Sequence, residues 1–149
     1  MPRRFHPFHE VTQTTFIVST AGPALYEVTR EVANWTRDFR DGLLTLMIRH
    51  TSASLLIQEN ADPDVQADLH AFYHQLVPPT TAPEMSYLRH RAEGPDDMPA
   101  HIKAAMLPIS LSIPVIQGCL RLGTWQGIYV FEHRTAPHRR EIAAHFAPS

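Results

Sequence analysis

Thirteen prolines spread along 149 residues keep this chain from forming long uninterrupted helices or strands. Together with neighbouring glycines they divide it into short elements, in the order strand, helix, two strands, two helices and then several strands. Helices that do not alternate regularly with strands argue against a doubly wound parallel sheet. We therefore expect an α+β fold with a mainly antiparallel sheet.

Apolar periodicity and turn residues predict the bounds of these elements. Strands are expected at 9–20, 43–50, 52–58, 110–117, 119–124, 126–132 and 139–146, and helices at 24–38, from Asp62 onward, and at 99–107. The strand at 43–50 has little polar character and is expected to be buried. Asp62 is the expected N-cap of the second helix, with Pro63 in its first turn and an apolar face along it. Pro114 requires an edge or a bulge in its strand.

Length and charge limit the classes of protein to which the chain can belong. Its 149 residues, 44% of them hydrophobic, fit a single domain over 1–149. A net charge of −2 argues against a nucleic-acid partner, and no apolar run reaches membrane-spanning length. The basic start has no long apolar region after it, so we expect no signal peptide. The only cysteine, Cys119, excludes an intrachain disulfide, which suits the cytoplasm, and its apolar neighbour favours an inert thiol.

The densest group of chemically versatile side chains lies between His90 and His101. This stretch holds two imidazoles and the carboxylates of Glu93, Asp96 and Asp97. It begins as a loop and enters a helix near Pro99, so loop and helix entrance supply polar groups together. Such a group suits a metal, a phosphate or a proton-transfer pair. The alternative is a solvated loop with ordinary surface histidines.

Two further segments place polar side chains at the ends of predicted strands. His50 follows a strand and precedes small hydroxyl residues, as a ligand or general acid/base requires. The alternative is a hydrogen-bonded structural histidine. Glu59 stands where a strand meets a helix, before the N-cap Asp62, and is expected to face a cleft unless it merely caps the helix.

Two segments near the carboxyl end could contact a phosphorylated ligand. Three glycines in 118–127 let backbone approach a phosphate, and Trp125 could stack on a flat ring. By spacing alone, a bulged hairpin with a core tryptophan is favoured. Arg139 and Arg140 could clamp a phosphate, although paired arginines usually belong to a solvated surface.

Taken together, these segments resemble the YjbQ family, whose members are described as secondary thiamine-phosphate synthase enzymes. The resemblance covers about 12–144 and is closest to the bacterial branch. It rests on His50-Thr-Ser-Ala-Ser, Glu59-Asn-Ala-Asp-Pro63, His90, Asp96-Asp-Met-Pro99, His101-Ile-Lys, Gly123-Thr-Trp-Gln-Gly127 and Glu132-His-Arg134. Pro108 departs from it, because relatives commonly have glycine there, and is expected to alter only a turn.

The resemblance implies a compact α+β domain with a β-sandwich and about three helices, assembled as a homotrimer, with the site near a subunit boundary. The implied polar set is His50, Glu59, Asp62, His90, Asp96 and His101, with Thr124, Trp125, Gln126 and Arg140 beside it.

Three functions follow as expectations. The first is a transferase that joins a pyrimidine pyrophosphate to a thiazole phosphate as a secondary activity. In this reaction Mg²⁺ held by Glu59 or Asp96 helps to neutralise the leaving group. His101 and Arg140 are expected to face the phosphates, and Trp125 to cover a ring. His50 is expected among the catalytic residues. The second is hydrolysis of a phosphate or amide by Zn²⁺ or a similar metal on His50, His90 and His101, with Glu59 as a further ligand. The third is a trimer that binds a phosphorylated metabolite without turnover.

Overall fold

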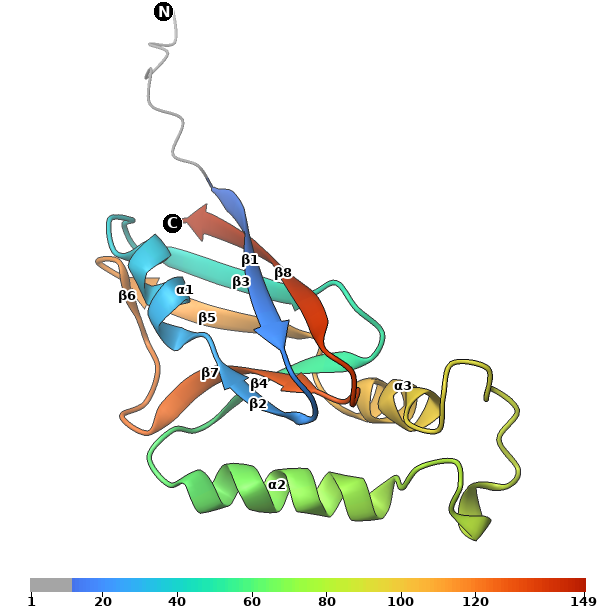
Figure 1. Ribbon diagram of the computed structural model, residues 1–149. Helices are drawn as coiled ribbons and strands as arrows, with labels where there is room; N and C mark the ends of the chain where they lie inside the picture. The colour runs from blue at the N-terminus through green and yellow to red at the C-terminus, as the bar shows by residue number, and fades with distance from the viewer. Residues whose placement is uncertain (1–11) are drawn as a thin grey trace, which may run out of the picture.

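The computed structural model describes residues 12–149, which form two antiparallel sheets and three helices (Figure 1). The five-stranded sheet has the order β1 (Gln13–Thr20), β8 (His138–Pro148), β3 (Gly42–Ile48), β5 (Ser110–Ile116) and β6 (Cys119–Leu120). The three-stranded sheet has the order β2 (Ala24–Glu27), β7 (Gln126–Glu132) and β4 (Ala53–Glu59). The helices are α1 (Thr29–Thr36), α2 (Pro63–Leu76) and α3 (Asp97–Met106), with a 3-10 turn, η1 (Pro83–Met85), between the last two. The expected α+β class with antiparallel sheets is confirmed.

The core lies where the two sheets face one another, and each strand of the larger sheet contributes alternate residues to it. In β3, Leu44, Leu46 and Ile48 are buried, whereas Leu43 and Met47 are exposed. The prediction of a fully buried strand at 43–50 is therefore wrong. The outer face of this sheet is not covered by any element of residues 12–149, so only one face of β3 is buried.

Two other predicted elements differ from the structure. The helix expected at 24–38 is wrong for its first turn, because residues 24–27 form β2 and pair with β7. These residues form an edge strand of the smaller sheet, and α1 begins only at Thr29. The strand expected at 119–124 is limited to β6, which pairs with β5 beyond Pro114. The first strand begins at Gln13, and the part predicted at 9–11 lies outside the described residues.

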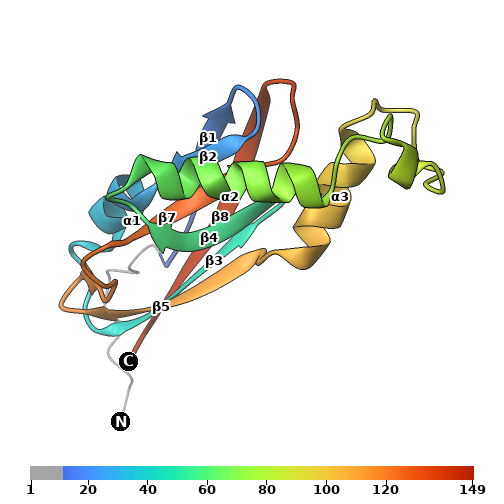
Figure 2. The same cartoon turned by 90° about the horizontal axis from the view of Figure 1, so that it is seen from below.

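Helix α2 follows the smaller sheet on its outer side (Figures 1 and 2). The Asp62 carboxylate caps it by accepting a hydrogen bond of 2.9 Å from the Asp64 N–H, which confirms the predicted N-cap. Its predicted apolar face is covered only in part: Tyr73 is half-buried, whereas Phe72 and Leu76 are exposed.

The turn between β5 and β6 depends on glycine at position 118. Gly118 has φ of +76°, and a Cβ atom there would overlap the carbonyl oxygen of Arg37. We expect Gly118→Ala to lower the free energy of unfolding by roughly 2 kcal/mol or more, because backbone strain and a backbone clash act together. Urea denaturation measures this loss. Gly123→Ala is the control, since a Cβ atom at position 123 would lie 3.3 Å from its nearest neighbour, the Oε1 atom of the flexible Gln126 side chain. An equal loss in both variants would contradict the prediction.

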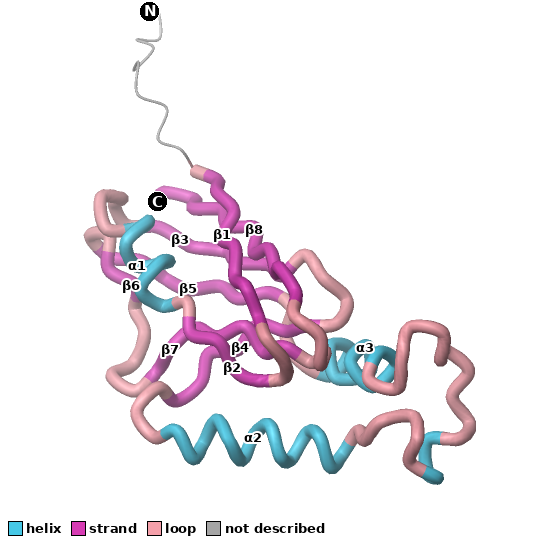
Figure 3. Tube along the Cα trace, in the orientation of Figure 1, coloured by secondary structure: helices cyan, strands magenta, loops and turns pink. Residues whose placement is uncertain are grey.

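Helix α3 begins at Asp97, two residues before the predicted start, and Pro99 lies in its first turn as expected. The connection from α2 to α3 extends beyond the sheets at one end of the molecule (Figures 1 and 3). None of the helices within 12–149 is both long and apolar enough to cross a bilayer.

Candidate metal centre

Four side chains from α3 and the loop before it converge into one cluster. His90 and Glu93 come from the loop, and Asp97 and His101 come from the first two turns of the helix. Each offers a ligand atom within 4.8 Å of the other three. Asp97 and His101 are four residues apart and therefore share one helix face. We call these four residues the His–Asp cluster.

The Asp97 carboxylate is the centre of this cluster. Its Oδ2 atom lies 2.6 Å from His90 Nε2 and 3.2 Å from His101 Nε2, and Glu93 Oε2 lies 3.3 Å from the same His90 nitrogen. Asp97 is 1% exposed, whereas the other three side chains reach solvent. The arrangement therefore offers nitrogen and oxygen ligands on a rigid base with an accessible side.

Residues behind the cluster fix the orientation of its side chains. The Nδ1–H of His101 donates to the Thr51 carbonyl at 2.9 Å, so Nε2 is the ring nitrogen that faces Asp97 and the cluster. Metal-binding histidines usually use their second nitrogen in this way. The Arg134 guanidinium donates to Asp97 Oδ1 at 2.6 Å and to Asp96 Oδ2 at 2.8 Å, which ties both carboxylates to the end of β7.

The charges in the cluster favour an ionised carboxylate. Burial opposes ionisation of Asp97, but the hydrogen bond from His90 and the charge of Arg134 outweigh it and hold the pKa of Asp97 below its usual range. The hydrogen bond to Asp97 raises the pKa of His90, and Glu93 adds to this effect. A metal ion would replace the proton that His90 and Asp97 share in their hydrogen bond. The affinity for a metal is therefore expected to rise with pH.

The structure places two predicted residues beside the cluster. Asp96 accepts hydrogen bonds from Arg134 and from the Thr135 N–H, and these bonds lower its pKa although burial opposes them. His50 lines a cavity of about 270 Å³ together with His101. Its Nε2 accepts the Glu141 N–H at 2.8 Å, so the proton is on Nδ1. Burial and then the Arg140 charge lower the pKa of His50.

Another set of predicted residues gathers at the opposite end of the smaller sheet. The start of β4 lies near the cluster, because the Thr51 carbonyl contacts His101. Glu59 is the last residue of β4 and lies about 20 Å along the strand from its first residue, Ala53, at some 3.3 Å per residue. The loop before β7 lies next to it, because the Asn60 N–H donates to the Trp125 carbonyl at 2.9 Å. Asp62, Thr124 and Gln126 belong to the same end. The chain alone therefore does not bring these residues to the His–Asp cluster.

Arg140, predicted to face a phosphate, lies in the interior. It is 3% exposed and its Nε donates to Glu132 Oε2 at 2.6 Å, while its Nη2 donates to Ser52 Oγ at 3.0 Å. Glu132 is fully buried and also accepts a hydrogen bond from Thr20. This arrangement favours a structural role for Arg140.

Sequence reasoning included Glu93 and Asp97 in the polar stretch that suits a metal, but it chose neither of them as a metal ligand. The spacing of Asp97 and His101 on a helix could have identified Asp97, since residues four apart share a face. Glu93 belongs to an irregular loop, where spacing predicts no direction for a side chain.

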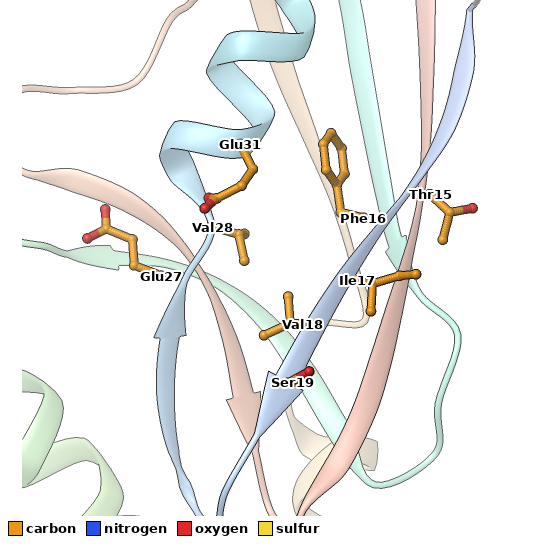
Figure 4. Close-up of a pocket in the computed structure, with 8 residues that line it drawn as sticks. All are labelled: Thr15, Phe16, Ile17, Val18, Ser19, Glu27, Val28 and Glu31. Atoms are coloured by element: carbon orange, nitrogen blue, oxygen red, sulfur yellow. The ribbon is translucent and has the colours of Figure 1, made fainter.

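A groove of about 440 Å³ between β1 and the start of α1 is a less suitable site (Figure 4). Its charged groups are the carboxylates of Glu27 and Glu31, and the other residues that line it are apolar or carry hydroxyls. It offers neither imidazole nor a basic side chain to a phosphorylated ligand.

Comparison with known proteins gives a consistent picture. The family model described as UPF0047 protein YjbQ-like matches residues 13–149. The UPF0047 protein sll1880 of Synechocystis is 45% identical over 135 residues, which cover 89% of each chain. The UPF0047 protein YjbQ of Escherichia coli O157:H7 is 42% identical over 135 residues, covering 89% of this chain and 94% of that one.

Solved structures agree with this relationship. The conserved hypothetical protein TT1486 of Thermus thermophilus superposes with a TM-score of 0.79 at 30% identity, covering 90% of this chain and 99% of that one. The hypothetical protein APE1520 of Aeropyrum pernix gives 0.80 at 26% identity, covering 92% and 98%. Sequence and fold together establish that the chain belongs to the YjbQ-like UPF0047 family.

Proposed function

We propose that this protein is a metal-dependent enzyme that hydrolyses or transfers a phosphate-containing group of a small substrate. The observation that carries the proposal is the convergence of His90, Glu93, Asp97 and His101 within 4.8 Å of one another. Two imidazoles with carboxylates suit Zn²⁺ or a similar transition metal better than Mg²⁺, which prefers oxygen ligands. Such a metal lowers the pKa of a bound water and polarises a phosphoryl oxygen.

The chain's own residues have distinct tasks in this proposal. Asp97 provides fixed negative charge, and Arg134 holds it in place. His101 is oriented by the Thr51 carbonyl. His50 presents its Nδ1–H from the neighbouring cavity and would donate a hydrogen bond to a substrate oxygen there.

Metal content and hydrolysis test this proposal together. Protein purified without a histidine tag is expected to hold about one equivalent of a transition metal and to hydrolyse pyrophosphate or a phosphate monoester. A chelator should abolish turnover and the metal should restore it.

His101→Ala should lose the metal, whereas the control His145→Ala, which replaces an exposed histidine on β8, should keep it. Less than about one-tenth equivalent per chain, with no uptake on titration, would refute a tight site. Metal uptake without turnover of any phosphate substrate would instead support the non-catalytic binding function.

Thiamine-phosphate synthesis remains a second candidate. Its specific support is Trp125, whose side chain is 63% exposed on the loop anchored by Asn60 and is available to stack on a flat ring. Because this loop lies far from the His–Asp cluster within one chain, the reaction would need both ends brought together by neighbouring subunits. Formation of thiamine phosphate from the two substrates, lost on Trp125→Ala, is the test.

We propose that the protein forms a homotrimer and that the outer face of the larger sheet is the subunit interface. Its outer face exposes Ile17 of β1 and Leu43 and Met47 of β3, the two strands that flank β8, and Ile116 is exposed at the end of β5. An exposed apolar patch of this kind is typical of a subunit interface. We expect a trimeric mass in solution, and a cytoplasmic location agrees with the single cysteine.

A further inference from the structure

A second polar cavity lies between α2, α3 and the segment joining β7 to β8. It has a volume of about 120 Å³, and none of the four cluster residues lines it. Its polar lining consists of His70, His74, Asp96, Lys103, His133 and Thr135. We call it the α2–α3 cavity. Figure 2 shows the end of α2 approaching α3 at this side of the molecule.

Lys103 is the only lysine of the chain and is 7% exposed. Within residues 12–149, no carboxylate lies within 4 Å of its ammonium group. A buried cation without a partner is costly, and proteins usually pair such a group. The lining of the cavity thus contains a positive charge that no carboxylate of the described residues contacts directly, although the Asp96 charge acts on it from beyond 4 Å.

His133 provides a second unmatched group. Its side chain is 3% exposed, its Nε2 lies 2.9 Å from Ser54 Oγ, and its Nδ1 has no hydrogen-bond partner among the described residues. If the Ser54 hydroxyl donates to Nε2, then Nδ1 carries the hydrogen and only this donor is unsatisfied. The reverse arrangement would leave both the hydroxyl hydrogen and the Nδ1 lone pair unsatisfied, which costs more.

One oxygen of the carboxylate that lines the cavity, Asp96 Oδ2, is already occupied. Asp96 Oδ2 accepts from Arg134 Nε at 2.8 Å and from the Thr135 N–H at 3.0 Å. His70 and His74 reach the cavity from one face of α2, with ring centroids 6.0 Å apart. Donors and positive charge therefore prevail, and the missing partner is an acceptor with negative charge.

We infer that the α2–α3 cavity binds a phosphate group through Lys103 and His133. The volume is below the range of about 300–1,000 Å³ typical of pockets for whole small molecules, so a single phosphate fits better than a nucleotide. That phosphate is either a free ion or the end of a larger ligand. Ordered water could satisfy the His133 N–H but would leave the Lys103 charge unpaired. The two sites share no lining residue, and the inference uses neither a metal nor the cluster residues, although Arg134 contacts both Asp96 in this cavity and Asp97 in the cluster.

The single lysine makes a direct experiment feasible. Full-length protein labelled with ¹⁵N-lysine has one Nζ signal, which is followed while inorganic phosphate replaces chloride at constant ionic strength. A chelator is present throughout, so that phosphate bound to a metal does not contribute and failure of the metal site does not affect the result. We expect a saturable shift of this signal. No saturable shift, or an equal shift with chloride alone, would overturn the inference.

A variant and a second ligand complete the test. Lys103→Met keeps the length of the side chain and removes its charge, and the His133 imidazole signal then reports binding. Phosphate affinity should fall by about 10- to 100-fold, the value of a charge-assisted hydrogen bond. Arg121→Met, which removes an exposed cation, should bind as the wild type does. Unchanged affinity in Lys103→Met would overturn the inference. Binding of methyl phosphate would support a site for the end of a larger ligand, and binding of inorganic phosphate alone would support a free-ion site.

Discussion

Replacing Arg140 with methionine is expected to lower the free energy of unfolding by about 3–5 kcal/mol. The substitution leaves the fully buried Glu132 carboxylate without the guanidinium that donates to both of its oxygens. Urea denaturation at pH 7 measures the loss. The matched control is Arg49→Met, because Arg49 pairs with Glu141 at 3.2 Å on the surface and should cost less than about 1 kcal/mol.

The pH dependence of the free energy of unfolding, measured for the wild type and for Arg140→Met, distinguishes the loss of the ion pair from a loss of packing. Burial disfavours the Glu132 carboxylate, but the Arg140 hydrogen bonds outweigh this and hold its pKa below the usual value. In the wild type, the ionised Glu132 therefore stabilises the fold. This stabilisation is fully present above the unfolded-state pKa of about 4.5 and is lost as pH falls through the lowered pKa of the folded state. In Arg140→Met, the unpaired Glu132 should have a raised pKa, so acid relieves its cost. The difference in stability should therefore narrow as pH falls toward about 4, and a constant difference would contradict this explanation.

Replacing Asp97 with asparagine is expected to weaken binding of Zn²⁺ or a similar metal by about 100-fold or more. The reason is that, among the carboxylates of residues 12–149, only Asp97 has an oxygen within 4 Å of both imidazoles of the cluster. Asparagine keeps the shape of the side chain, and its Oδ1 can still accept from Arg134, so the fold should persist. Isothermal titration calorimetry with the metal measures the change.

Asp68→Asn provides the matched control for this experiment. It removes one exposed carboxylate from α2 and should leave metal affinity unchanged. If Asp97→Asn bound metal as tightly as the wild type while remaining folded, the His–Asp cluster would not be the metal site. If both variants lost affinity equally, the loss would reflect general charge and not coordination.

The antiparallel α+β architecture could be predicted because it depends on local patterns. Proline and glycine mark the ends of elements, and the Asp62-Pro63 pair begins α2 as expected. The segment 24–27 could not be predicted, because its apolar spacing fits a helix while pairing with β7 decides the outcome. Exposure of Leu43 and Met47 depends on what covers the sheet, which the sequence of one strand does not specify.

The candidate site shows the same division. His90 and His101 could be placed in one site because they flank a short loop and a helix start. The separation of Glu59 and Trp125 from them could not be predicted, since it depends on the direction of β4 through the sheet. Arg140 resembled a surface cation in sequence, and only its contact with Glu132 across the β7–β8 connection shows that it is buried.

The guanidinium of Arg134 contacts both Asp97 in the His–Asp cluster and Asp96 in the wall of the α2–α3 cavity. Any ligand that shifts this side chain at one place also alters the carboxylate at the other. Occupancy of the two sites would then be cooperative, and thermodynamic reciprocity requires that each ligand change the affinity for the other by the same factor. A single arginine would thus make the protein respond to two ligands jointly.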